Sequence, residues 1–569
     1  MSGVNMKSKR HEGQMALALL FAALLVGSAY PLTTEDIDII WTIPGDTAVE
    51  AFGLSLASGD VNGDGIPDIA VGSYVYCEES LPRPDRGRVD IYYGSHVGDS
   101  APDLVLWSPW WSGSSAPQLV CGDLNGDGYA DVVMAEDMAD SGYGACTIWR
   151  GGSLMDTVPD CFIRSRSIWW LNGGFGRDIS IGDVNGDDYD DLAVGAYRAA
   201  EQPGHQGAGR VYVFYGGPSF DSIPDVTLRG EHDGESEGFG IGVSAEGDFD
   251  HDGFDDLYIG AWQYGGFGGR GRVYVYYGGN SMDTSYDMAM LGEGPAQCLG
   301  FDKPGALNSQ GSFDYAVEGN ELWPHGIFNP GANCGKVYVH QGGRPMDSIP
   351  DVAIVGRMDS ANLGYSAQSA GDATGDGNDD LAGGAPWLPP CASGGAYLWE
   401  TDNCFDTVPD AWMTGEPNRL VGMRVCTAGD IDGDGRSEFL VSDYNCDPRQ
   451  HVWVCKYTGV GLQEEEALRT RSGTALRAYP SPCRDQVWIS CPPAAGENST
   501  LRVCDVTGRV VRTQAVPQCE SGRASPTVLW DLRDNAGRRV GQGVYVIELE
   551  QKGGNEPRRC SAKVIVERQ

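Results

Sequence analysis

The sequence predicts an all-β protein, a seven-bladed β-propeller followed by a small β-sandwich. The main observation is an acidic loop followed by an apolar run, which first occurs at residues 59–72 and returns at intervals of about 60 residues. Each interval also holds short runs in which apolar and polar residues alternate between Gly, Pro and Asp, as in hairpin strands. Four such strands per interval, in seven intervals, are typical of propeller blades.

The overall composition agrees with turn-rich β structure and excludes one class of partner. Gly accounts for 82 of the 569 residues and aromatic residues for 10%. The formal net charge of −40 argues against binding to nucleic acid, whose phosphates attract Lys and Arg.

Residues 1–29 are expected to be a signal peptide. Lys7, Lys9 and Arg10 form a basic start, residues 15–26 an apolar core, and residues 27–29 a small-residue cleavage site. The alternative is a membrane span, which needs roughly 18 or more apolar residues. No later stretch is that long and apolar, so we expect no transmembrane segment in the mature chain.

The 16 cysteines fit export to an oxidising compartment, where many would form disulfides. Spacing does not fix the connectivity. Three local pairs are plausible: Cys446 with Cys455, Cys298 with Cys334, and Cys391 with Cys404.

The propeller is expected to span residues 36–458. A Pro-Asp pair stands between several units, as at Pro159-Asp160, Pro224-Asp225 and Pro350-Asp351, and a short apolar strand is expected after each. Residues 37–43 match that strand, yet they precede the first unit. The last unit ends at residue 457 without such a strand. The N-terminal run is therefore expected to complete the last blade and to close the ring.

Six acidic loops carry a pattern suited to calcium: residues 60–68, 123–131, 183–191, 248–256, 372–380 and 430–438. Positions 1, 3, 5 and 9 hold oxygen-bearing side chains, and position 7 can offer a backbone carbonyl. Calcium takes roughly 6–8 oxygen ligands, so we expect about six Ca²⁺ sites. The predicted ligands are Asp60, Asn62, Asp64, Ile66 and Asp68; Asp123, Asn125, Asp127, Tyr129 and Asp131; Asp183, Asn185, Asp187, Tyr189 and Asp191; Asp248, Asp250, Asp252, Phe254 and Asp256; Asp372, Thr374, Asp376, Asn378 and Asp380; and Asp430, Asp432, Asp434, Arg436 and Glu438.

Two departures from the pattern are visible in the sequence. Position 6 is Gly in five loops, which permits the sharp turn, but Asp188 stands there in the third loop and predicts weaker binding. A seventh copy at residues 308–320 lacks acids at the ligand positions, so we expect no metal there.

The loops differ from EF-hands, which place a Glu at position 12 and a helix on each side. Here position 12 is apolar or Gly, and strands flank the loop. The other alternative is a set of turns rich in Asp, Asn and Gly without an ion. Six copies with matching acid positions favour the ion, because crowded carboxylates repel one another unless a cation joins them.

The Phe-Gly starts (Phe52-Gly53, Phe175-Gly176, Phe239-Gly240), the acidic loops and the Gly-Ala or Gly-Ala-Pro ends of the strands resemble FG-GAP repeats. These repeats build the seven-bladed propeller of integrin α subunits. The resemblance covers residues 36–458. It implies calcium loops on the lower face of the propeller and ligand binding on the upper face.

Aromatic residues stand in the loops that this resemblance places on the upper face. Tyr74, Tyr197, Trp262 and Trp387 stand at or beside the equivalent position in four units and are candidate ligand-binding residues. Exposed aromatic rings suit a sugar or a protein hot spot. The alternative is that they only pack the rim of the central channel.

Motifs for catalysis are weak. The eight histidines form no HExxH motif, and residues 266–271 match GxGxxG without a following helix. We therefore predict no catalytic residues, although an extracellular polysaccharide-active or lipid-active enzyme on a propeller scaffold remains an alternative.

The composition changes after the propeller. Residues 459–476 are polar and are expected to form a linker. Residues 463–569 contain 13 acidic and 16 basic residues, so this part of the chain has a small positive net charge. Residues 477–569 alternate as in a small β-sandwich. Tyr479-Pro480-Ser481-Pro482, Asp505-Val506-Thr507-Gly508-Arg509, Trp530-Asp531 and Gly543-Val544-Tyr545 resemble motifs of type IX secretion sorting domains and of the Ig-like domain of flagellar hook-capping proteins. Cys483 stands where the family often has Phe.

These expectations combine into one function. The chain is expected to be a secreted or cell-surface calcium-binding propeller of a bacterium with an outer membrane, acting in adhesion or ligand binding. Its partners would be an extracellular protein or glycan and, through the tail, the outer-membrane secretion machinery. A purely structural surface-layer role is a further alternative.

Overall fold

In the computed structural model the chain divides into two compact units, Met1–Gly459 and Val460–Gln569. The regular elements of the described residues are strands, apart from the 3₁₀ turn η1 (Gly94–His96) and the short α2 (Ala139–Gly142), which agrees with the all-β prediction. The predicted signal peptide and residues 460–476 of the predicted linker lie outside the described residues. The structure describes residues 33–46, 50–75, 86–110, 117–165, 173–200, 207–232, 237–265, 269–292, 305–309, 312–319, 335–341, 348, 350, 352–356, 361–388, 392–401, 407, 409–444, 450–459, 477–479, 487–490, 499–505, 509–515, 527–535, 537–541, 543–551 and 558–566.

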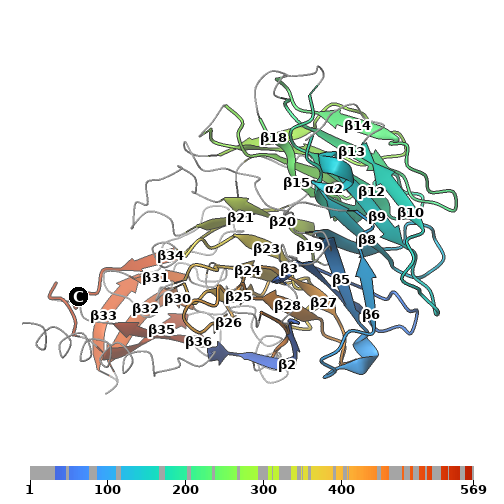
Figure 1. Ribbon diagram of the computed structural model, residues 1–569. Helices are drawn as coiled ribbons and strands as arrows, with labels where there is room; N and C mark the ends of the chain where they lie inside the picture. The colour runs from blue at the N-terminus through green and yellow to red at the C-terminus, as the bar shows by residue number, and fades with distance from the viewer. Residues whose placement is uncertain are drawn as a thin grey trace, which may run out of the picture. The chain divides into compact units, whose positions relative to one another are not determined.

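The described part of the first unit contains six four-stranded sheets and one five-stranded sheet, all antiparallel (Figure 1). Most are built from four consecutive strands, as the repeat predicts. In chain order the strands are β3 (Glu50–Gly59), β4 (Asp68–Val75), β5 (Arg86–Tyr92), β6 (Leu104–Trp107); β7 (Gln118–Gly122), β8 (Asp131–Glu136), β9 (Ala145–Trp149), β10 (Cys161–Arg164); β11 (Phe175–Gly182), β12 (Asp191–Ala196), β13 (Arg210–Phe214), β14 (Val226–Arg229); β15 (Phe239–Ser244), β16 (Leu257–Ala261), β17 (Arg272–Tyr276), β18 (Met288–Leu291); β19 (Gly305–Ser309), β20 (Ser312–Gly319), β21 (Lys336–Gln341), β22 (Val352–Val355); β23 (Ser366–Ser369), β24 (Leu381–Gly384), β25 (Gly395–Trp399), β26 (Ala411–Thr414); and β27 (Val425–Gly429), β28 (Glu438–Ser442), β29 (His451–Tyr457).

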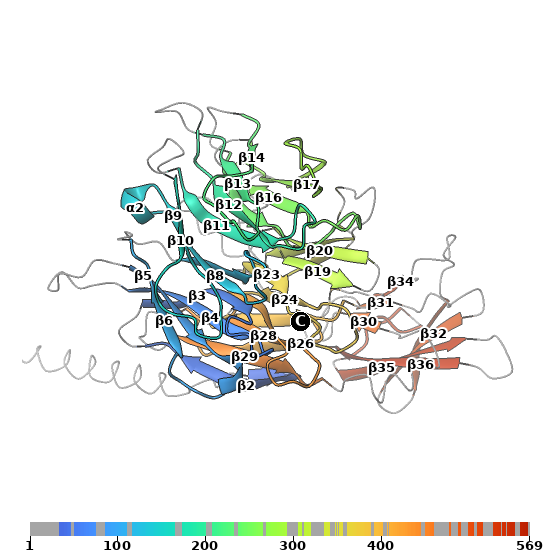
Figure 2. The same ribbon diagram turned by 90° about the vertical axis from the view of Figure 1, so that its right-hand side faces the viewer.

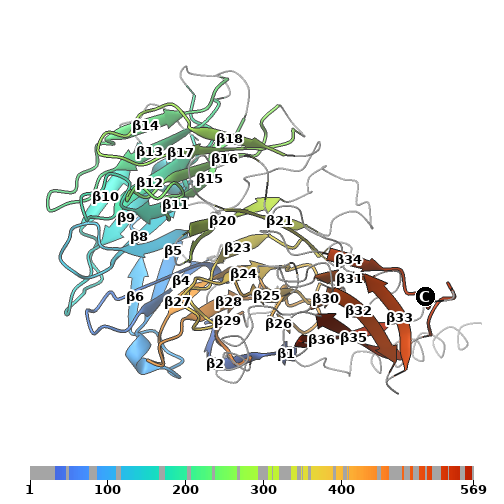
Figure 3. The ribbon, with the colours of Figure 1, turned by 180° about the vertical axis from the view of Figure 1, so that it is seen from behind.

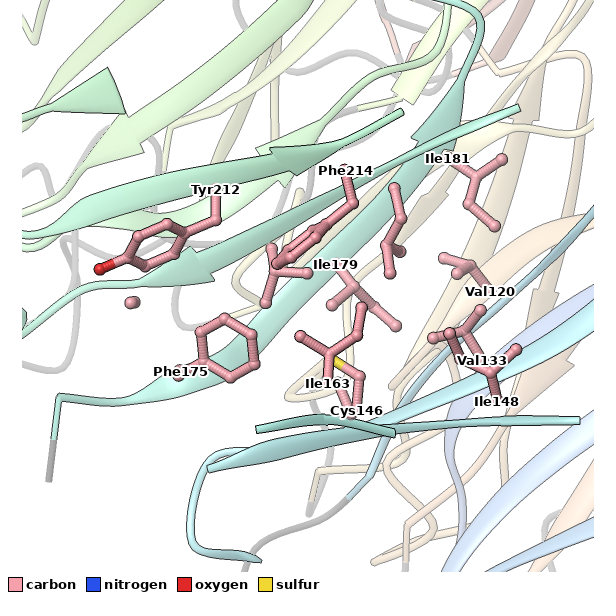
Figure 4. Close-up of a cluster of buried hydrophobic side chains, with 14 of the residues drawn as sticks. Val120, Val133, Cys146, Ile148, Ile163, Phe175, Ile179, Ile181, Tyr212 and Phe214 are labelled. Carbon is pink, nitrogen blue, oxygen red and sulfur yellow. The ribbon is translucent and has the colours of Figure 1, made fainter. Parts of the chain in front are cut away.

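Buried side chains fill the space between consecutive sheets. One cluster joins β7–β10 to β11–β14, with Ile148 and Ile163 on one side and Phe175 and Phe214 on the other (Figure 4). First strands lie beside one another in six pairs of neighbouring sheets: β3 with β7, β7 with β11, β11 with β15, β19 with β23, β23 with β27, and β27 of the last sheet with β3 of the first. Between the sheets β15–β18 and β19–β22, Tyr338 of β21 packs in a buried cluster with Tyr258 and Val275. Sheets packed face to face in sequence order, with the last against the first, form a β-propeller.

The Phe-Gly starts have a structural explanation. Phe52, Phe175 and Phe239 are buried in clusters between neighbouring sheets. The Gly after each has a positive φ of 78–84° and lies within a shift of the strand register. The motif therefore combines a core side chain with a β-bulge that needs glycine.

The N-terminal strands complete the last two sheets. β2 (Ile37–Pro44) pairs antiparallel with β29, from Ile37–Tyr457 to Pro44–His451, and this confirms the predicted pairing (Figure 2). The sequence did not reveal β1 (Thr33–Glu35), which pairs with β26 and makes that sheet five-stranded (Figure 3). The segment 33–44 therefore adds one edge strand to each of two neighbouring sheets.

The described part of the second unit contains two antiparallel sheets with a shared core. The core includes Val487 and Trp530 from one sheet and Leu501 and Ile547 from the other. One sheet holds β30 (Arg477–Tyr479), β31 (Val487–Ser490) and β34 (Thr527–Trp530), and the other β33 (Val510–Ala515), β32 (Ser499–Asp505), β35 (Gly543–Gln551) and β36 (Arg558–Val566).

The structure corrects one predicted disulfide. Cys455 carries a free, buried thiol whose Sγ lies 3.9 Å from Met413 Sδ, so the Cys446–Cys455 bridge is not formed. Cys446 and both members of the other two predicted pairs lie outside the described residues. Within the described ranges, no helix has the length and apolar character that a membrane span requires.

Candidate metal centres

Each acidic loop connects the first and second strands of its sheet. In the first loop the Asp60 carboxylate accepts backbone N–H groups from Gly63, Asp64 and Gly65 at 2.7–3.1 Å. The Asp64 carboxylate accepts the N–H of Ile66 at 2.9 Å. In the other five loops the carboxylate at position 1 also accepts the N–H of position 6, and the carboxylate at position 5 accepts the N–H of position 7, so the loops share this hydrogen-bond pattern.

The carboxylate at position 9 is buried in all six loops, whereas among the acids at positions 1, 3 and 5 only Asp250 is buried. Asp68 is 1% exposed and Asp256 is fully buried, and the same holds for Asp131, Asp191, Asp380 and Glu438. Burial raises the pKa of Asp68 to about 7 and that of Asp256 to about 8. Burial also raises the pKa of Asp131 to about 6, those of Asp191 and Glu438 to about 7, and that of Asp380 well above its ordinary value. A desolvated carboxylate beside other acids is stabilised by a nearby cation.

In two loops the acids already converge. One oxygen from each of Asp248, Asp250 and Asp256 lies within 4.8 Å of the others, and Asp430, Asp432 and Glu438 form the same arrangement. These are positions 1, 3 and 9. Carboxylate oxygens gathered in this way suit a hard cation such as Ca²⁺.

The side chain at position 7 has a role that the sequence did not reveal. A Cβ on Gly63 would lie 2.2 Å from the ring of Tyr129, and the same relation holds between Gly126 and Tyr189 and between Gly186 and Phe254. Position 7 of one loop therefore covers position 4 of the preceding loop, where only glycine leaves room.

Backbone hydrogen bonds join the loops as well. Ala130 donates its N–H to the Asp60 carbonyl at 2.9 Å, and Asp255 donates to that of Asp183 at 3.0 Å. The Asp255 carboxylate also accepts the N–H of Asp183 at 2.9 Å. The position 1 ligand of one loop is thus held by position 8 of the next.

The degenerate copy at residues 308–320 has a shorter connection. β19 ends at Ser309 and β20 begins at Ser312, so only residues 310 and 311 separate the two strands. Residues 60–67 separate β3 from β4 in the first sheet. The prediction that this copy holds no metal concerns side chains outside the described residues.

The four candidate ligand-binding aromatics are placed separately along the ring. Tyr74 is buried on β4, whereas Tyr197, Trp262 and Trp387 are half-buried. The rings of Tyr197 and Trp262 cover Gly174 and Gly238, the residues directly before two Phe-Gly starts. The Trp387 ring meets Tyr365 edge-on at a centroid distance of 4.9 Å. All four residues therefore have a packing role, and their ligand-binding role stays a prediction.

Comparisons with known proteins support the repeat assignment. Residues 52–92, 175–214 and 239–276 match the FG-GAP repeat. The chain is 32% identical to integrin alpha-5 of Xenopus laevis over 169 residues, which cover 28% of this chain and 15% of that protein. It is 27% identical to integrin alpha-7 of Homo sapiens over 251 residues, which cover 41% of this chain and 20% of that protein. The chain thus spans a fifth or less of the length of these relatives.

The comparison with solved structures includes PorZ, described as an essential bacterial surface component of the type-IX secretion system of Porphyromonas gingivalis. The match covers 90% of this chain and 81% of the PorZ chain, at 11% sequence identity. Its TM-score of 0.26 supports no argument about fold or function. The fold and the matched segments together show a β-propeller built with FG-GAP repeats, similar to integrin α subunits.

Proposed function

We propose that this chain is a secreted or cell-surface FG-GAP propeller of seven blades that binds Ca²⁺ and acts as an adhesion or ligand-binding module. The six sheets with an acidic loop and the sheet β19–β22 would be its blades. The similarity to integrin α subunits supports an extracellular ligand, a protein or a glycan. The second unit would be an Ig-like sorting domain, a proposal that rests on its sequence motifs.

The observation that carries the calcium proposal is the buried carboxylate at position 9 in six equivalent loops. Without a cation, each loop holds a desolvated acid next to two or three others. Calcium would be bound by the side-chain oxygens of positions 1, 3, 5 and 9 and by the backbone carbonyl of position 7. Such a set of oxygen donors fits the coordination that Ca²⁺ prefers. The ion would neutralise that charge and fix the loop that connects two strands.

Calcium should therefore stabilise the propeller. Extracellular sites have Kd values of roughly 10⁻⁴–10⁻³ M. At a few millimolar Ca²⁺, binding to the folded state alone then contributes about 1–2 kcal/mol per occupied site. Removing the ion with a chelator should lower the melting temperature substantially, as measured by differential scanning calorimetry in both conditions.

A single-site variant localises the effect. Asp68→Asn should lose one bound Ca²⁺ and part of the calcium-dependent rise in melting temperature, whereas the exposed Asp99→Asn should change neither. If exhaustive chelation with confirmed metal loss leaves the melting curve unchanged, the calcium proposal is wrong. The ligand class is tested in a separate experiment, in which a glycan and protein array is probed with the calcium-loaded protein.

A further inference from the structure

The sixth acidic loop, residues 430–438, differs from the others in what surrounds its position 9 carboxylate. In the other five loops this carboxylate accepts a backbone N–H from just beyond the third strand of the sheet. The donor–acceptor pairs are Gly94 to Asp68 at 2.9 Å, Gly151 to Asp131 at 2.9 Å, Gly216 to Asp191 at 2.8 Å, Gly278 to Asp256 at 2.8 Å and Thr401 to Asp380 at 3.3 Å.

In the last sheet the chain does not turn at this point. β29 continues to Tyr457, because its edge pairs with β2 through Ile37–Tyr457 and Asp38–Lys456. Within the described part of the chain, Glu438 Oε1 is buried and has no hydrogen-bond partner. The strand pairing that closes the ring thus leaves this carboxylate without the donor that its equivalents have.

A lysine side chain reaches into the same loop. Lys456 lies one residue beyond the Phe439–Cys455 pair, and its ammonium group contacts the carboxylates at positions 3, 5 and 9. Nζ is paired with Asp432, lies 2.7 Å from Asp434 Oδ2 and lies 3.8 Å from Glu438 Oε1. The side chain of Lys456 is only 20% exposed. An ammonium group thus lies among the acids that would bind Ca²⁺.

The fourth loop, residues 248–256, provides an internal comparison. It has carboxylates at the same four positions, but Tyr277 takes the place of Lys456, one residue beyond the Leu257–Tyr276 pair. The two loops therefore offer the same charge to a cation and differ in whether the protein supplies one itself.

We propose that Lys456 is an internal cation of the sixth loop, which competes with Ca²⁺ and makes this loop the weakest of the six sites. This inference rests on the calcium binding proposed above. The ammonium group offers three donors to acceptor-only carboxylates. Calcium can take its full set of oxygens only after Lys456 has left, so binding there must replace existing ion pairs.

The test is the variant Lys456→Met, compared with Arg150→Met in the full-length protein. Arg150 lies at the same register of the second sheet, one residue beyond the Val132–Trp149 pair, and its side chain is exposed. Both variants remove one positive charge, so the pair controls for net charge. Calcium binding is followed by isothermal titration and by metal analysis at buffered free Ca²⁺.

Lys456→Met should bind Ca²⁺ at one site roughly tenfold more tightly than the wild type, a change of about 1.4 kcal/mol. Its melting temperature should fall in chelator, because three carboxylates lose their counter-charge, and recover in Ca²⁺. Arg150→Met should show neither effect. Equal calcium affinity and equal melting temperature in Lys456→Met and the wild type would overturn the proposal.

The outcomes separate this proposal from the calcium proposal. If no loop binds Ca²⁺, the proposed function fails. The role of Lys456 as a counter-charge is then tested by the melting temperatures of Lys456→Met and the wild type in chelator, where the variant should melt at the lower temperature. If Lys456→Met does not fold, acetylation of the chelated protein by acetic anhydride, read by mass spectrometry, replaces it. Lys456 should then react less in the wild type than in Asp432→Asn, and equal reactivity would overturn the proposal.

Discussion

Asp188 adopts a backbone φ of 67° at position 6 of the third acidic loop. The equivalent residues Gly65, Gly128, Gly253, Gly377 and Gly435 have φ between 84° and 93°. This left-handed conformation favours glycine, although Asp tolerates it better than most residues. The backbone N–H of Asp188 still donates to the Asp183 carboxylate, at 3.0 Å. The loop therefore keeps its shape with a strained residue inside it.

Replacing Asp188 by Gly should stabilise the protein. Relief of the left-handed conformation is expected to raise the free energy of unfolding by about 1 kcal/mol. The reverse change, Gly128→Asp, should lower the free energy of unfolding by a similar amount. A Cβ at this position would have no neighbouring atom within 4 Å, so the change reports only the cost of the left-handed backbone conformation. Urea unfolding of both variants in Ca²⁺ measures the two changes. A destabilised Asp188→Gly would show that the aspartate side chain contributes more than its backbone costs.

At the scale of the elements, sequence spacing predicted which residues of each loop carry oxygen, because that pattern is local. It did not predict that Tyr129 covers Gly63, since the two residues lie in different repeats and their contact depends on how the sheets pack. The same limit explains why β1 was not predicted: three residues carry no periodic pattern, and their partner β26 lies in a distant repeat. Contacts between residues of different repeats can be identified only from the three-dimensional arrangement of the sheets.

The N-terminal strand β2 holds the last sheet against the first through its side chains. Trp41 is 3% exposed within the cluster that includes Phe52 and Val454, and its Nε1 donates to the Asp99 carbonyl at 2.9 Å. Trp41→Ala should therefore lower the free energy of unfolding by about 3–5 kcal/mol. Thermal and urea unfolding of the isolated variant in Ca²⁺ measures this loss.

Trp107→Ala is the matched control, because Trp107 lies on the edge strand β6 and is 42% exposed. Its loss should be no more than about 1 kcal/mol, which includes its contact with the Arg88 guanidinium. Similar losses in the two variants would contradict the closing role of β2.

At the scale of the whole molecule, the two units have separate cores, and the first unit closes through β2 and β29 without residues beyond Gly459. A protein ending at Gly459 should fold with the melting temperature and calcium response of the propeller in the full chain. In a host with type IX secretion, it should remain in the periplasm while the full-length protein reaches the surface. Calorimetry and cell fractionation with surface proteolysis measure the two parts.

The two results bear on different proposals. A truncated protein that is displayed as well as the full-length form would rule out a sorting role for the second unit. A truncated protein that does not melt cooperatively would show that the propeller needs the second unit for stability.

The pairing of β2 with β29 also bears on the timing of folding. The ribosome makes residues 37–44 before almost every other part of the propeller, yet their partner strand is among the last made. The nascent chain must therefore carry an unpaired strand containing Ile39, Ile40 and Trp41 until synthesis of the ring is nearly complete. A contact of such long sequence separation forms slowly and leaves an aggregation-prone edge exposed meanwhile. This segment therefore needs protection from contacts with other chains for longer than the strands that pair within their own repeat.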